Sequence, residues 1–150
     1  MKMHRAIARV ESWGPLFPAM LGMAWLTWVR ASSTAQPEIG DGALHYLQAL
    51  HSWQHPWLFL DTWAKPVFVL LASPFAQLGF WGLALFNGLV ALSTMVAIMR
   101  IIPDRAQLLR WAVPVLLMTS PQYLFMVFSG MTEPLFGLLA VSSVYLLLSG

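Results

Sequence analysis

The chain has 150 residues, of which 59% are hydrophobic and only 9% are charged, and its mean hydropathy is +0.69. A soluble domain carries about a quarter charged residues, so this composition predicts an integral membrane protein. The chain contains no cysteine, which excludes disulfides and thiolate metal sites. Its net charge of +2 comes from too few basic residues to form the continuous basic face that nucleic-acid binding needs.

The first predicted membrane span covers residues 13–29, an uncharged stretch. Three basic residues precede it (Lys2, Arg5 and Arg9), so the positive-inside rule places the N-terminus in the cytoplasm. The same region loosely fits a cleavable signal peptide, but its tryptophans favour a retained span with an interfacial aromatic belt.

Residues 30–65 then form a predicted extracytoplasmic loop. After a turn signal rich in proline and glycine, Leu44 and Leu47 lie on one side of a helical pattern, while His45 and Gln48 lie on the other. This pattern predicts an amphipathic helix at the membrane surface. Its interfacial anchors would be Trp53, Trp57 and Trp63.

Residues 66–99 form an uncharged stretch that allows two arrangements: two full spans joined by a turn, which would leave the next arginines outside, or a re-entrant or juxtamembrane helix followed by one span. As one straight helix it would be about 51 Å long, well beyond the roughly 30 Å of a bilayer core. Ser73-Pro74 and Gly79 interrupt it, and we expect 66–79 to form a re-entrant or juxtamembrane helix while 80–101 crosses the membrane. This choice returns the following arginines to the cytoplasm, as the positive-inside rule requires. They are Arg100, Arg105 and Arg110.

Two further spans are predicted at 111–128 and 134–150. The fold class is therefore an all-α membrane protein with about four transmembrane helices, the amphipathic helix and the re-entrant or juxtamembrane helix. The last apolar run has no basic anchor after it. We therefore expect the chain to be the N-terminal part of one larger polytopic domain.

Two acids stand out against this apolar background. Asp41 follows the first span, and Glu133 lies between two long apolar stretches. A carboxylate within the bilayer costs on the order of 2.5–3.5 kcal/mol, so such residues usually face water, a partner or a substrate. The predicted topology puts both acids on the extracytoplasmic face. Each also has a simpler interpretation as a helix cap or turn residue, with Pro134 at the first helical position after a Glu133 cap.

Three segments resemble the GT-C superfamily of membrane glycosyltransferases, in the family's order. Gly40-Asp41-Gly42-Ala43-Leu44-His45-Tyr46 resembles the acidic motif after the first span. Trp63-Ala64-Lys65-Pro66-Val67-Phe68 resembles the Lys-Pro-Pro segment of the protein-mannosyltransferase and aminoarabinose-transferase branches. Thr119-Ser120-Pro121 and Gly130-Met131-Thr132-Glu133-Pro134-Leu135-Phe136 resemble the third span and second acidic loop. The chain departs from the pattern at Gly42, where relatives often have a second acid, and at Val67, where they have a second proline.

The resemblance implies transfer of a sugar from a polyprenyl-phosphate donor to a hydroxyl acceptor, in a bacterial inner membrane, with the active site on the extracytoplasmic side. It implies catalytic roles for Asp41, as general base, and for Glu133. The two acids are also the candidate ligands of a divalent cation, Mg²⁺ or Mn²⁺. Lys65, His45 and Tyr46 are the candidate substrate-binding residues, although a lysine at a membrane edge also snorkels without binding anything. The alternative from the residues alone is an ion- or proton-coupled transporter using the same two acids.

Overall fold

The computed structural model describes residues 14–32, 40–62 and 65–150. Within these ranges the chain forms seven α-helices and one 3-10 helix, and no strand. The predicted all-α class is confirmed. Several residues used in the predictions lie outside the described ranges, namely Lys2, Arg5, Arg9, Trp13 and Trp63.

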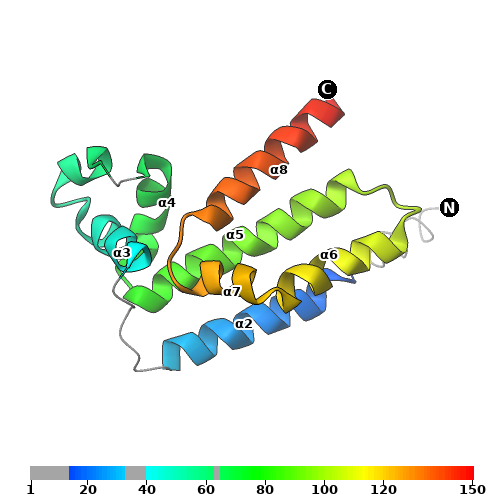
Figure 1. Ribbon diagram of the computed structural model, residues 1–150, viewed down its shortest axis with the longest axis horizontal. Helices are drawn as coiled ribbons and strands as arrows, with labels where there is room; N and C mark the ends of the chain where they lie inside the picture. Colours follow the sequence, from blue (N-terminus) through cyan, green and yellow to red (C-terminus); the bar gives the residue numbers. More distant parts are fainter. Residues whose placement is uncertain (1–13, 33–39, 63–64) are drawn as a thin grey trace, which may run out of the picture.

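Two antiparallel helices form the centre of the fold. Helix α2 spans Leu16–Ser32 and α5 spans Phe80–Ile101, with α2 lying along α5 (Figure 1). Small and flexible side chains fill their shared core. These are Ala19, Met23, Ala91, Met95 and Met99. Helix α5 begins after Gly79, whose φ of +95° favours glycine, and it matches the predicted helix 80–101.

The predicted stretch 111–128 is divided into two helices. Helix α6 spans Gln107–Thr119 and α7 spans Pro121–Phe128, with a bend of 65° between them. Proline disfavours helical backbone in the residue before it, and Ser120 is accordingly extended, with ψ of 107°. The Ser120 hydroxyl accepts a hydrogen bond from the backbone N–H of Tyr123 at 3.3 Å. The break thus starts a newly capped helix.

Helix α8 spans Glu133–Ser149, close to the predicted 134–150. It starts near the beginning of α5 and runs in the same direction as α5 (Figure 1). Leu135 and Leu138 pack near Phe86 and Val90 in a common core. Beyond this contact the helix is exposed and apolar, as Leu147 shows with 83% of its side chain accessible.

Three short elements gather at the end where α5 begins (Figure 1). They are α3 (Asp41–His51), the 3-10 helix η1 (Pro56–Leu60) and α4 (Pro66–Ala76). The expected interruption at Ser73-Pro74 does not occur, because α4 continues through Pro74. Pro74 cannot donate a hydrogen bond to Leu70, and the Ser73 hydroxyl donates to that carbonyl instead, at 2.9 Å. Three residues, Gln77, Leu78 and Gly79, separate α4 from α5.

Helix α3 is buried on its polar side. His45 and Gln48 are 5% and 3% exposed, whereas Leu44 and Leu47 are 38% and 49% exposed. In a helix lying on a soluble core the apolar side would be the buried one. The division of α3 into a leucine face and a polar face is as the sequence predicts, and in the structure the leucine face is the one turned outward.

The described residues contain one helix, α5, that is long and apolar enough to cross a membrane, or two if the bent α6–α7 pair counts as one span. The expected number of about four is not reached. Helices α2 and α8 have 17 residues each, which is about 26 Å against a core of roughly 30 Å. Helix α4 has 11 residues, about 16 Å, and is too short to cross, as predicted for 66–79.

Candidate functional site

Asp41 is the first residue of α3 and is exposed. Gly40 occupies the cap position, and no side-chain hydrogen bond caps the helix. The carboxylate therefore lies in the first turn, where a negative charge complements the positive end of the helix dipole. The side chain makes no hydrogen bond or ion pair within the described ranges, so the capping role weighed for Asp41 has no bond to support it.

A contact between two glycines joins the start of α3 to the α7–α8 loop. A Cβ atom added to Gly42 would collide with the carbonyl oxygen of Ser129 and lie 2.9 Å from its carbonyl carbon. A Cβ atom on Gly130 would lie 3.1 Å from the Gly42 oxygen, and Gly130 has a φ of +79°. Only glycine allows the two backbones to approach so closely. The residue after Asp41 therefore touches the loop that leads to Glu133.

Glu133 is the first residue of α8 and is exposed. The expected cap shifts by one residue, because Thr132 takes the cap position and Pro134 follows as the second helical residue. Asn87 of α5 holds the loop that precedes Glu133. The Asn87 side chain is fully buried and donates from Nδ2 to the Met131 carbonyl oxygen at 2.9 Å. Asn87 therefore ties this loop to α5.

The ring of Phe80 links three of the surrounding elements. Tyr46 of α3 meets it edge-on at 5.5 Å between ring centroids, and a Cβ atom on Gly130 would lie 3.4 Å from its Cε2 atom. The guanidinium carbon of Arg30, in the last turn of α2, lies 5.0 Å from the ring centroid. A cation over an aromatic face is attracted by the ring's quadrupole.

Arg30 was not among the predicted site residues. In the sequence it stands at the edge of the first span, where a single basic residue indicates only snorkelling at the membrane boundary. Nothing near Arg30 in the sequence points to Phe80, fifty positions later. The contacts around Phe80 are what single out Arg30, and these contacts exist only after folding.

The other two predicted substrate-binding residues make different contacts. His45 is buried, with its ring 5.8 Å from that of Phe68, and its Nδ1 atom has no hydrogen-bond partner in the described chain. Lys65 is exposed at the residue before α4, and its side chain makes no hydrogen bond or ion pair among the described residues. Within the described ranges, no hydrogen bond or ring contact links either residue to Gly42 or Gly130.

The described residues hold no group of three or more histidine or acidic side chains that could bind a metal ion. Asp41 and Glu133 offer two carboxylates. Mg²⁺ is commonly bound by one or two carboxylates together with substrate phosphates, so the pair suits it only with substrate present. A divalent cation at Asp41 and Glu133 stays a prediction.

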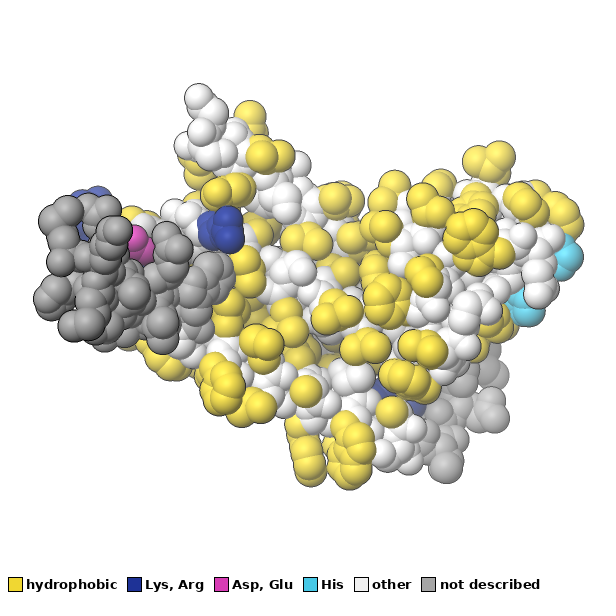
Figure 2. Space-filling model, turned by 180° about the vertical axis from the view of Figure 1, so that it is seen from behind, with side chains coloured by type: hydrophobic (Ala, Val, Ile, Leu, Met, Phe, Trp, Pro, Cys, Tyr) yellow, Lys and Arg dark blue, Asp and Glu magenta, His cyan; other side chains and the backbone are white. Residues whose placement is uncertain are grey.

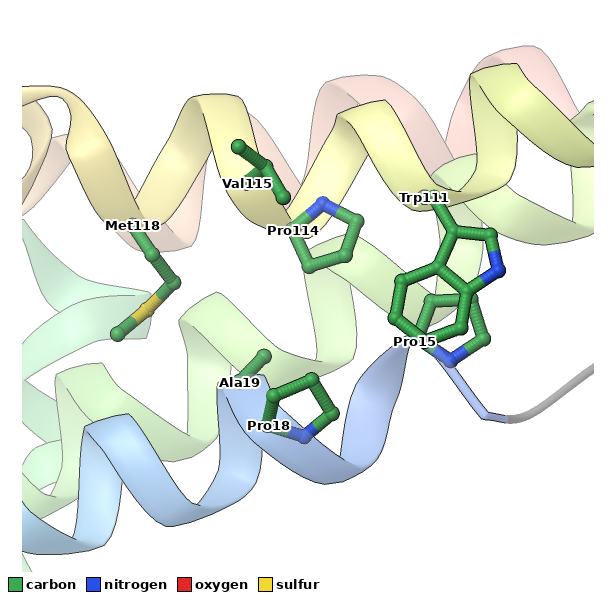
Figure 3. A pocket seen from close by; sticks show the side chains of 7 residues that line it. All are labelled: Pro15, Pro18, Ala19, Trp111, Pro114, Val115 and Met118. Carbon is green, nitrogen blue, oxygen red and sulfur yellow. The ribbon is translucent and has the colours of Figure 1, made fainter.

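Two apolar cavities flank α2. The smaller, of about 140 Å³, lies between the start of α2 and α6 and is lined by Pro15, Pro18, Trp111, Pro114 and Met118, among others (Figure 3). It offers no charged group. The larger, of about 540 Å³, is a groove between α2 and α5 that extends to the turn after Trp28 and to Trp81. The larger cavity thus approaches Arg30 and Phe80.

Comparisons of this chain with known protein families, with curated proteins and with solved structures find no match.

Proposed function

We propose that this chain is a membrane-embedded part of a GT-C-like glycosyltransferase that uses a polyprenyl-phosphate sugar on the extracytoplasmic side. One observation carries the proposal: the backbone contact between Gly42 and Ser129–Gly130 brings the two acid-bearing segments together. The resemblance names these same segments as the two acidic motifs. A shared site requires them to meet, and Asp41 and Glu133 lie 92 positions apart in the sequence.

The apolar surface supports the membrane setting. Hydrophobic side chains are spread over the described part of the face seen in Figure 2, with few charged groups among them. Monomeric soluble proteins rarely expose apolar patches larger than a few hundred Å². The outward leucines of α3 and the side chains of Trp53 and Trp57 are further exposed apolar groups. Together these features favour a helix bundle surrounded by lipid, with α3 at the interface.

The direction of the helices supports the proposed topology. Helix α5 leads away from Gly130 and Glu133, α6 and α7 return toward them, and α8 leads away again (Figure 1). Arg100, Asp104 and Arg105 therefore lie at the other end of α5 from the two acids. With that basic end in the cytoplasm, Asp41 and Glu133 face the extracytoplasmic side.

The proposed chemistry uses Asp41 as a general base. The acceptor hydroxyl attacks the anomeric carbon, a new C–O bond forms, and the bond to the phosphate oxygen breaks with its electron pair. The hydroxyl proton passes to the Asp41 carboxylate. The proposed role of Glu133 is to orient the acceptor by accepting a hydrogen bond.

The transporter alternative is less well supported by this arrangement. That class predicts acids along a path through the membrane, at broken helices near its midplane. Here both acids stand at the same end of the described bundle, each at the start of a helix. The one broken pair, α6–α7, bends at Ser120 and carries no acid.

The test is sugar transfer by the full-length protein in vesicles, with a radiolabelled polyprenyl-phosphate sugar. Asp41→Asn should lower the rate about 10²–10⁴-fold, the usual contribution of a general base. Glu133→Gln should lower it less. Asp104→Asn is the matched control, because this exposed acid lies at the other end of α5, and it should transfer at the normal rate. Full activity in Asp41→Asn would contradict the proposal.

A further inference from the structure

Two histidines lie one helical turn apart where α3 ends. His51 is the last residue of α3, and His55 follows four positions later, at the residue before η1. The backbone N–H of His55 donates to the His51 carbonyl oxygen at 2.9 Å, so the chain completes a helical turn between them. Residues four apart on such a turn are neighbours on one face, with about 5–6 Å between their Cβ atoms. The two imidazoles therefore share one surface of the molecule.

Both imidazoles are accessible at that surface. His51 and His55 are exposed, and histidine side chains (cyan) lie at this end of the molecule in Figure 2. Neither ring makes a hydrogen bond or an ion pair within the described ranges. The ring of His55 packs against that of Trp57, with 4.7 Å between the ring centroids, and this contact limits the directions in which His55 can point. Two neighbouring imidazoles with unused nitrogens can chelate a metal ion.

The local charge favours a cation at this position. His51 belongs to the last turn of α3, where the helix dipole presents its negative end. Residues 31–64 contain no lysine or arginine, so this segment brings no fixed positive charge close to the pair.

The ligand chemistry selects the kind of ion. Imidazole nitrogen suits Zn²⁺, Cu²⁺ and Ni²⁺, whereas Mg²⁺ and Ca²⁺ take oxygen ligands. Histidines at positions i and i+4 are also the spacing by which one helical face holds zinc in metalloproteases. The described residues supply no group of three histidine or acidic side chains, so water completes the coordination. The site is therefore open, and weaker than a structural zinc site with four protein ligands.

We infer that His51 and His55 chelate one Zn²⁺ ion at the end of α3. The bound ion joins the last turn of α3 to the residue from which η1 starts. The site is separate from the two acids, because Asp41 begins α3 and His51 ends it, about 15 Å apart along the helix axis. The inference is independent of the proposed sugar transfer.

The first experiment is a calorimetric titration of the full-length protein, prepared without a histidine tag, with Zn²⁺. His51→Gln and His55→Gln should each lower the affinity of this one site at least about tenfold, since loss of an outer partner of a metal ligand already costs about 10–100-fold. Gln54→Ala is the matched control, because Gln54 is exposed in the same turn, and it should bind as the unmodified protein does. All three variants should unfold at the unmodified protein's temperature when zinc is absent, since each changes an exposed side chain.

The second experiment locates the ion. Diethyl pyrocarbonate modifies accessible imidazoles, and mass spectrometry of the peptides reports on His51 and His55 separately. Zn²⁺ should protect both histidines in the unmodified protein. In His51→Gln it should no longer protect His55, and in His55→Gln it should no longer protect His51. Mg²⁺ should protect neither, because it prefers oxygen ligands.

Three results would overturn the inference: equal Zn²⁺ affinity in the unmodified protein and both glutamine variants, protection of only one of the two histidines, or equal protection by Mg²⁺. Weaker binding in Gln54→Ala would also count against it, because the effect would then belong to the turn and not to the imidazoles. None of these measurements uses sugar transfer. Failure of the proposed function would therefore leave their outcome unchanged, and the reverse also holds.

Discussion

The two ends of α5 use their charged residues in different ways. At the basic end, Arg110 pairs with Asp104 at 2.7 Å and donates to the Met99 carbonyl oxygen at 3.1 Å, so these charges close the turn between α5 and α6. At the acid end, backbone contacts and the buried Asn87 hold the loops, and the carboxylates of Asp41 and Glu133 make no hydrogen bond or ion pair within the described chain. A loop that is closed by other groups leaves its acids available for substrate.

The largest loss of stability and transfer is expected when the two acid-bearing segments are separated. In Gly42→Ala the new Cβ atom meets the Ser129 carbonyl, so the backbones must move apart. We expect a loss of about 1–3 kcal/mol in the free energy of unfolding, typical of overpacking. Sugar transfer should fall with it, because Asp41 and Glu133 then no longer share one site. Thermal unfolding in detergent and the transfer assay measure the two effects.

Gly137→Ala is the matched control for this substitution. Gly137 lies inside α8 and nothing lies within 4 Å of an added Cβ atom. Alanine should stabilise the helix by about 0.5–1 kcal/mol and leave transfer unchanged. Equal stability losses in Gly42→Ala and Gly137→Ala would show that the approach of α3 to the α7–α8 loop does not depend on glycine.

The hydrogen bond from Asn87 offers a second way to loosen the acid end. Asn87→Leu leaves the Met131 carbonyl oxygen without its donor and should destabilise the fold by about 1–3 kcal/mol. Transfer should fall although Asn87 touches no substrate, because the loop that carries Glu133 is no longer held. Ser93→Ala is the control, since the exposed Ser93 bonds only within its own helix, to the Leu89 carbonyl. A normal transfer rate in a folded Asn87→Leu protein would contradict this role.

The smallest effect is expected at the basic end. Asp104 is 90% exposed, and exposed ion pairs contribute at most about 1 kcal/mol. Asp104→Asn should therefore shift the unfolding temperature only slightly, with the shift vanishing at high salt as the pair is screened. A large loss of stability, or any loss of transfer, would show that the two ends of α5 are more alike than the contacts indicate.

Cysteine labelling tests on which side of the membrane each end of α5 lies. The chain contains no cysteine, so single cysteines at positions 104 and 131 report on one site each. A membrane-impermeant maleimide added outside intact cells should label position 131 and leave position 104 unlabelled. Labelling of position 104 from outside would reverse the proposed topology and remove the extracytoplasmic site.

The helical class and several helix bounds could be predicted from the sequence alone, because they depend on local properties. The uncharged run that starts after Gly79 predicts α5, and the run that starts at Pro134 predicts α8. The opposed faces of α3 also follow from spacing alone. Local patterns misjudged Pro74, whose missing bond Ser73 replaces, and did not show that Ser120 divides α6 from α7. The number of spans was overestimated because α2 and α8 have only 17 residues each and because Ser120 divides the third predicted span.

The contacts between distant residues could be learned only from the tertiary structure. Gly42 and Gly130 are ordinary turn glycines in the sequence, and their contact exists because α3 lies against the α7–α8 loop. The direction in which α3 turns its leucines, and the place of Arg30 over Phe80, depend on the same packing. Contacts between segments far apart in the chain depend on how several helices fit together at once. No single stretch of sequence contains that information.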